Sequence, residues 1–313
     1  MSVVEKTVDV AVPRAAERRA PRLRGLGDTW WRHVVGIAFS LFALFPVAYI
    51  VSAAFNADQS LSGASLIPRA VTFHNFRTLV APSAEDVKHF ASAADYPHWY
   101  GNTLIVATAT SFLTVMLGAL AAYAFSRFRF RGRRMGMLSL ILIQMFPQLL
   151  AVVAIYLIVY NVGDVFHVIG LNTITGLIMV YLGGVLSINT WLMKGFFDTI
   201  PSELDESARV DGATPAQVFW GVVLPLAAPV LAVIGLLSFI GTINEFVIAS
   251  VLLQTSKHQT LPVGLYNFIN SQYAQSWGPF AAGVLLAAIP FAILFLALQK
   301  FIVGGLTQGA VKG

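Results

Sequence analysis

The sequence has no cysteine and few charged residues. None of its 313 residues is Cys, which excludes disulfide bonds and thiolate metal sites. Asp, Glu, Lys and Arg make up 11% of the chain, whereas soluble domains carry about 25%. With 57% hydrophobic residues, the composition is that of a protein that crosses a membrane several times.

Motifs of catalysis and metal binding are also missing. The six histidines are scattered and none has metal-ligand spacing. The sequence contains no Walker lysine motif, no GxSxG elbow and no HExxH pair. We therefore expect no catalytic residue, no metal site and no cofactor on this chain.

What the sequence does contain is long apolar runs. A transmembrane helix needs about 20 consecutive apolar residues. Such runs must be helical, because lipid offers no hydrogen-bond partner to open backbone groups. The sequence thus predicts an all-α membrane protein with six transmembrane helices. The six runs cover residues 34–55, 102–126, 136–160, 174–193, 226–251 and 279–302.

Two kinds of residue stand out within these runs. Glu245, in the fifth run, is the one acid, and no run contains a Lys or Arg at its centre. Pro46, Pro147 and Pro290 lie inside runs, where each removes a backbone donor and is expected to kink its helix. A hinge for alternating access is the alternative function for such a kink.

The distribution of Lys and Arg predicts the orientation of the chain in the membrane. Sixteen of the twenty lie in segments that share one side, and four lie on the other. Since basic residues stay in the cytoplasm, both termini are predicted to be cytoplasmic. The net charge of +5 is then a signal of topology, and no nucleic-acid partner is expected.

The chain divides accordingly into a transmembrane permease domain with two tails. The predicted parts are a cytoplasmic N-terminal tail (1–33), the six-span domain (34–303) with an outside cap (56–101), a cytoplasmic loop (198–225) and an outside loop (252–278), and a cytoplasmic C-terminal tail (304–313). The outside cap is expected to be irregular, with one or two short helices.

A polar segment between the fourth and fifth runs is the most informative feature. It has the spacing Glu206-Ser-Ala-x-x-Asp-Gly212, followed by twelve residues and then Pro225. Pro201 suits a first helical turn capped by Thr199 or Ser202. A short helix should then run to Asp211 and end in a left-handed cap at Gly212.

A second helix is predicted directly after this turn. Thr214, Pro215 and Gln217 form the pattern of a capping box. Apolar residues follow at helical spacing on one face. The segment is therefore predicted to be a helical hairpin that presents Glu206 and Asp211 away from lipid.

The spacing of this segment resembles the EAA loop of ABC importer permeases. Nearly all of the chain after residue 30 is similar to the maltose/maltodextrin (MalG-type) permease subunits of this family. One departure is Ser207, where the family commonly has Ala. The matching pieces are Ser65–Pro68, Ala122–Phe125, Gln144–Pro147, Ile169–Thr173, Tyr181–Gly184, Asp211–Pro215, Leu224–Pro225, Ser238–Ile240 and Gly305–Gly313.

The resemblance implies a bacterial inner-membrane complex. Its partners would be a MalF-like companion permease, two copies of a MalK-like ATPase subunit that bind ATP and Mg²⁺, and an external sugar-binding protein. Glu206, Ser207, Ala208, Asp211 and Gly212 would seat in a cleft of the ATPase. A C-terminal tail, with Gly309, Lys312 and Gly313, would reach between the two ATPase subunits.

Two further groups of residues have candidate roles. Asn244 and Glu245 line the translocation path or contact the companion permease; alternatively, they lie close enough to the outer end to be wet. The resemblance implies that the outside loop reaches into the binding protein. Its contact candidates are Tyr266, Asn267, Asn270, Gln272 and Tyr273, for which an interfacial aromatic belt is the alternative.

The cargo and the class of transporter leave alternatives. Trehalose or another oligosaccharide fits the sequence as well as maltose does. A secondary transporter would show inverted repeats and paired broken helices, which the sequence does not display. A membrane scaffold would tolerate loss of the Glu206 charge, whereas a coupling loop would not.

Overall fold

A computed structural model describes residues 30–57, 68, 70–89, 94–270 and 276–310 of the chain. The chain divides into two compact units, residues 1–48 and 49–313, and each is described by itself. The described part of the first unit is the beginning of α1 (Trp30–Phe55), an apolar helix that contains Pro46.

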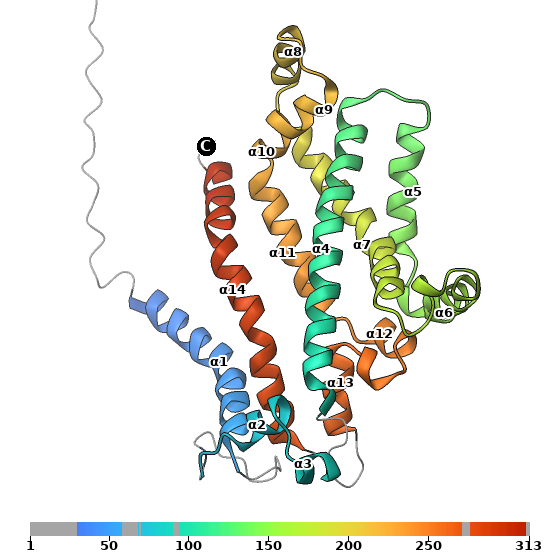
Figure 1. Cartoon of the computed structure of the whole chain (residues 1–313). Helices are drawn as coiled ribbons and strands as arrows, with labels where there is room; N and C mark the ends of the chain where they lie inside the picture. Colours follow the sequence, from blue (N-terminus) through green and yellow to red (C-terminus); the bar gives the residue numbers. More distant parts are fainter. Residues whose placement is uncertain (1–29, 58–67, 69, 90–93, 271–275, 311–313) are drawn as a thin grey trace, which may run out of the picture. The chain divides into compact units, whose positions relative to one another are not determined.

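The second unit is built on long helices that run side by side. Figure 1 shows α4 (Tyr96–Arg127), α7 (Ile174–Phe197), α11 (Ala228–Ile243) and α14 (Trp277–Ala310) in this arrangement. Helix α4 packs against α7 and α11, and α11 packs against α14. Helix α8 (Glu203–Val210) lies at one end of this unit and α13 (Leu261–Ile269) at the other, which we call the α8 end and the α13 end.

Shorter elements complete the second unit. Apart from an isolated antiparallel bridge between Asn56 and Val71, the described residues form helices and their connections. The remaining elements are α2 (His74–Val80), α3 (Ala84–His89), α5 (Arg133–Met145), α6 (Gln148–Val165), η3 (His167–Ile169), α9 (Pro215–Val218), the π-helical η4 (Phe219–Val223), α10 (Leu224–Leu226), α12 (Val247–Leu252) and η5 (Ser256–His258).

The prediction of an all-α membrane protein is confirmed. Among the described residues, five helices are long and apolar enough to span a membrane: α1, α4, α6, α7 and α14. A sixth candidate span is the pair Pro215–Leu226 and Ala228–Ile243, which is bent by 77°. Pro229, in the first turn of α11, has no N–H to continue the preceding helix, which explains the bend.

The third predicted run is two helices, so its prediction as one continuous span was wrong. Helix α5 ends at Met145 and α6 begins at Gln148. Phe146 has an extended backbone with ψ of 128°. Pro147 disfavours the helical conformation of the residue before it, and so it breaks the span where a kink was expected.

The fifth and sixth runs also differ from their predicted bounds. The fifth is interrupted at residues 244–246, so that α11 ends at Ile243 and a separate α12 begins at Val247. The sixth continues to Ala310, although residues 304–310 were expected to leave the helix. Glycine costs a helix only about 1 kcal/mol relative to Ala, and no proline follows to end it.

Three clusters of buried side chains hold the second unit together. One, at the α8 end, centres on Tyr123, Phe197 and Phe219. A second surrounds Trp99 at the α13 end. The third joins α7 to α12 around Tyr181. These clusters fix α8 and α12 against the long helices. They thereby position the segment that contains Glu206 and the residues next to Glu245.

Gly264 packs directly against the buried ring of Trp99. A Cβ atom at Gly264 would lie 2.0 Å from Trp99 Cδ2. We expect Gly264→Ala to destabilise the fold by about 1–3 kcal/mol, because the ring has to shift in a filled core. Thermal unfolding of the detergent-purified chain measures this.

Gly101→Ala is the matched control, since nothing lies within 4 Å of a Cβ at that position of α4. Equal melting temperatures for the two variants would contradict the close packing of Gly264 on Trp99.

Candidate functional site

The helical hairpin predicted after α7 forms at the α8 end. Helix α8 ends at Val210, and Gly212 follows with φ of 87°, the left-handed conformation predicted for it. Thr214 and Gln217 form the predicted capping box, in which the Thr214 N–H donates to Gln217 Oε1 at 2.8 Å. Both local predictions are confirmed.

The start of the hairpin differs from the prediction. Helix α8 begins at Glu203, so Pro201 lies before the helix instead of in its first turn. Ser202 occupies the N-cap position without a side-chain capping bond. The Thr199 hydroxyl donates to Phe196 O, one turn back in α7. The residues before α8 therefore complete the end of α7, which explains the later start.

Most of the five predicted coupling residues lie at the surface of the hairpin. Glu206, Ser207, Asp211 and Gly212 are exposed. Ala208 is half-buried and packs against the cluster around Phe219. The Ala213 N–H donates to the Ala208 carbonyl at 2.9 Å, which closes the turn between α8 and α9. Contact of these residues with an ATPase stays a prediction.

Apolar side chains extend this exposed surface. Val210 is 88% exposed and Leu204 is 40% exposed. Together with Glu206 they give the exposed surface of the hairpin both apolar and acidic side chains.

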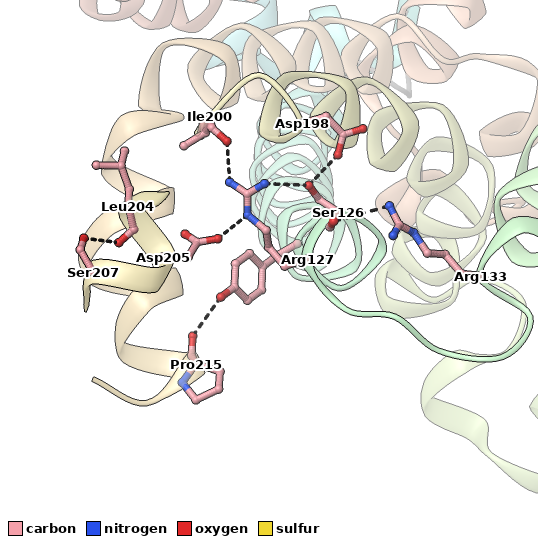
Figure 2. Close-up of polar contacts among 10 residues, drawn as sticks. Ser126, Arg127, Arg133, Asp198, Ile200, Leu204, Asp205, Ser207 and Pro215 are labelled. Atoms are coloured by element: carbon pink, nitrogen blue, oxygen red, sulfur yellow. Dashed lines mark hydrogen bonds and ion pairs between the residues drawn. The ribbon is translucent and has the colours of Figure 1, made fainter. Parts of the chain in front are cut away.

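A buried ion pair ties α8 to the end of α4. Arg127 Nε lies 2.5 Å from Asp205 Oδ2, and the two side chains are 10% and 4% exposed. Arg127 also donates from Nη2 to the carbonyl of Ile200 at 2.9 Å. Figure 2 shows the Arg127 side chain between Asp205 and Ile200. One guanidinium thus holds both α8 and the segment that enters it.

A second set of contacts ties α4 to the end of α7. Ser126 Oγ donates to Asp198 Oδ1 at 2.6 Å (Figure 2). Lys194 pairs with the other oxygen of Asp198. Burial raises the pKa of Asp198, but the hydrogen bonds from Lys194 and Ser126 outweigh it and leave the pKa below the ordinary value of 3.8. Asp198 is therefore ionised at neutral pH.

These positioning residues were not singled out from the sequence. In the sequence, Arg127 is one of several basic residues beside an apolar run, and no pattern distinguishes Asp205 from its neighbour Glu206. The sequence of a short helix with several acids does not indicate which acid is buried and which are exposed. The tertiary contact with α4 decides which acid is buried.

A family profile decides where this chain belongs. The profile described as "Binding-protein-dependent transport system inner membrane component" matches residues 114–308, more than half of the chain. The chain belongs to this family. It is accordingly an inner-membrane permease component of an ABC importer, and not itself an enzyme.

Relatives of this permease are similar along nearly their full length. The galactooligosaccharide transport permease GanQ of Bacillus subtilis is 37% identical over 296 residues, 92% of this chain and 100% of that protein. The maltose/maltodextrin transport permease MalG of Vibrio vulnificus is 40% identical over 288 residues, 91% of this chain and 96% of that protein.

Solved structures have the same fold. A crystal structure of a bacterial ABC transporter that imports the acidic polysaccharide alginate matches with a TM-score of 0.71 and 25% identity, over 88% of this chain and 98% of that chain. The alginate transporter in complex with a pentasaccharide-bound periplasmic protein matches with a TM-score of 0.63 at 15% identity, which shows the fold alone.

In this permease Glu245 lies in the break between α11 and α12. Its carboxylate accepts hydrogen bonds from the Ile248 N–H at 2.8 Å, the Ala249 N–H at 3.1 Å and the Tyr181 hydroxyl. The charge is therefore satisfied within the chain by the start of α12 and by α7. This geometry favours a positioning role for Glu245 over direct contact with cargo.

Asn244 is in a different environment. It is exposed, and its side chain donates to the Ile240 carbonyl at 2.9 Å. The two residues predicted to share one role are thus separated: the Asn244 side chain bonds back to the end of α11, whereas the Glu245 side chain accepts from the start of α12. Lining of the translocation path by either residue stays a prediction.

Removal of the Glu245 carboxylate should destabilise the connection between α11 and α12. We expect Glu245→Ala to leave the Tyr181 hydroxyl and two backbone donors unpaired, at about 1–3 kcal/mol for each buried group. The maximal uptake rate should fall while the KM for cargo changes little. Glu245→Gln keeps an acceptor and should retain most of the rate.

Initial-rate uptake with both variants tests this. A large rise in KM for Glu245→Gln would instead indicate direct contact with cargo.

The loop after α12 is anchored to α4 and to the turn before α7. Asn172, at φ of 56°, accepts at Oδ1 from the N–H groups of Gln254 and Thr255 at 2.7 and 2.8 Å. Trp99 donates from Nε1 to Ser256 O at 2.7 Å. These bonds fix the base of α13, where the predicted contact residues for a binding protein lie.

Those contact residues fall into two groups. Tyr266 packs edge-to-face on Phe246, next to the α11–α12 break, with 5.2 Å between the ring centroids. Asn267 and Asn270 are exposed near the end of α13, and Asn267 donates to the Gln259 side chain at 3.1 Å. Gln272 and Tyr273 lie outside the described residues. Contact with a binding protein stays a prediction.

The predicted ATPase-contacting tail is described only in part. Gly309 lies in the last turn of α14. Lys312 and Gly313 lie outside the described residues.

Proposed function

We propose that this chain forms half of the translocation pathway of a binding-protein-dependent importer for maltose/maltodextrin-type sugars. The 40% identity to a maltose/maltodextrin permease over 91% of the chain carries this proposal. In this importer a MalF-like permease would lie beside this chain. Two MalK-like ATPase subunits, which hold ATP and Mg²⁺, would bind on its cytoplasmic side. An external sugar-binding protein would deliver the cargo.

Coupling would occur through the exposed hairpin at the α8 end, which we place in the cytoplasm from the distribution of Lys and Arg. Glu206, Ser207, Asp211 and Gly212 would contact the ATPase, and Ala208 would keep the hairpin compact. Closure of the ATPase dimer on ATP would move α8. The Arg127–Asp205 pair would pass this movement to α4 as a rigid-body rotation, because both charged side chains are buried and in close contact.

The cargo has a second candidate that rests on a specific similarity. GanQ, a galactooligosaccharide permease, is 37% identical over its full length. Trehalose and other oligosaccharides are equally compatible with the sequence of this chain, because specificity in such a complex would reside largely in the binding protein and the companion permease.

Gentle detergent extraction of the tagged chain from native membranes, followed by mass spectrometry, tests the assembly. We expect an ATPase subunit and a second permease to co-purify. The binding protein of the same system is then titrated with maltose, maltodextrins and galactooligosaccharides. Recovery of the chain alone, in conditions that preserve known complexes, would overturn the proposed assembly, and tight binding of galactooligosaccharides alone would move the cargo to the second candidate.

A further inference from the structure

A groove lies between α5 and α7 near the α8 end of the second unit. Its volume is about 820 Å³, and it is open along one side. One wall comes from the first three turns of α5 and the other from the last turns of α7. The mechanism proposed above uses neither this groove nor the exposed face of α5.

The walls of the groove are apolar along the length of α5. Met135, Leu138 and Ile141 recur every third residue, and they are 67%, 46% and 40% exposed. Trp191 of α7 faces the same groove and is 49% exposed. A continuous apolar track on a membrane-spanning protein suits an extended hydrocarbon chain more than it suits water.

The mouth of the groove is basic. Arg133, Arg134, Lys194 and Asp198 line it. Lys194 and Asp198 pair with each other, so the net charge of the mouth comes from the two arginines. Helix α5 also begins here, and its first turn contains no acid, which leaves the positive end of the helix dipole at the mouth.

We propose that this groove binds one anionic phospholipid, with the phosphate at Arg133 and Arg134 and an acyl chain along Met135, Leu138 and Ile141. An arginine fork matches phosphate oxygens, and Trp191 suits the boundary between headgroup and hydrocarbon. A free phosphate would use the mouth but leave the apolar track unfilled. The apolar length and the basic mouth together therefore favour a lipid.

This proposal requires only that the chain spans a membrane, and it stands apart from the nature of the cargo. Bound lipid would brace α5 against α7. Helix α5 needs such support, because none of its own residues is buried within the chain.

The test is native mass spectrometry of the full complex, titrated with phosphatidylglycerol or phosphatidylcholine. We expect phosphatidylglycerol to bind with one-to-one stoichiometry and Arg134→Gln to weaken it about fivefold, the contribution of one arginine near an anionic headgroup. The matched control is Arg131→Gln, which removes the same charge from the same basic segment. Arg131 is exposed and does not line the groove, so this variant should bind as the parent does.

A second variant fills the groove without any change in charge. Leu138→Trp should abolish the one-to-one complex while the chain elutes normally in gel filtration. A photo-reactive residue at Ile141 should cross-link to lipid in membranes.

Several results would overturn the proposal. Equal losses for Arg134→Gln and Arg131→Gln would mean diffuse attraction of lipid to the basic segment. Equal binding of phosphatidylcholine would remove the role of the arginines. Two results together would indicate a site for a free anion: millimolar inorganic phosphate displaces the phosphatidylglycerol, and Leu138→Trp binds this lipid as the parent does. Cross-linking of Ile141 to a companion protein would mean that a partner subunit fills the groove.

Discussion

Replacement of Asp205 by alanine is expected to abolish ATP-driven uptake and to destabilise the α8 end. The substitution leaves Arg127, which is 10% exposed, without its carboxylate partner. Removal of one member of a buried ion pair costs about 3–5 kcal/mol, because the remaining charge stays desolvated. Initial-rate uptake in proteoliposomes and thermal unfolding of the purified complex measure the two effects.

The control for this variant lies on the same helix. Glu203→Ala removes an equal charge from the first turn of α8, where the side chain is exposed. Its effect on stability should stay within about 0.5 kcal/mol, as for most surface substitutions. Indistinguishable uptake by Asp205→Ala and Glu203→Ala would refute the role of the buried pair.

A paired substitution separates stability from coupling. Arg127→Met with Asp205→Leu removes both charges, and apolar replacement of a whole buried pair is often neutral or stabilising. We expect the double variant to regain the thermal stability that Asp205→Ala loses. Uptake should recover only in part, because the ion pair between α8 and α4 and the hydrogen bond to the Ile200 carbonyl are gone.

Reversal of charge at Glu206 is the second change with a large expected effect. Glu206 is exposed on α8, so Glu206→Lys should leave folding intact. If Glu206 faces a basic residue of the ATPase, the reversal costs about 2–5 kcal/mol in that interface, or a loss of at least thirtyfold in affinity. Co-purification of the ATPase and ATP-driven uptake should both be lost.

Glu85→Lys provides the matched control. It makes the same charge change at an exposed position of α3, away from the α8 end. Uptake by this variant should equal that of the parent. Normal uptake by Glu206→Lys, with the ATPase still bound, would remove the coupling assignment from this hairpin.

The breaks in the membrane helices show the limit of hydropathy as a guide. The apolar runs predicted spans through Pro147 and through residues 244–246, because lipid-compatible composition continues across both places. The chain nevertheless stops its helices there. Broken spans of this kind also occur in secondary transporters, and the family match, not the helix pattern, excludes that class.

Glu245 shows why the fate of a single acid was left open. The sequence places it in an apolar run, where lining a path and reaching water were equally consistent. The structure supplies a third answer, in which Tyr181 and the first donors of α12 satisfy the carboxylate. Since Tyr181 lies in a different helix, no local pattern could have indicated this contact.

The sequence by itself determined the membrane class, the approximate places of the apolar runs, the left-handed Gly212 and the Thr214–Gln217 capping box. These features depend on residues within one turn or one run, so local composition and spacing are sufficient to predict them. Only the tertiary structure decided that Asp205 is buried while Glu206 is exposed, that Gly264 receives the ring of Trp99, and that α5 and α7 enclose a basic groove. Each of these depends on which distant helix packs nearby, because burial of a charge or a ring is a property of the contact between helices.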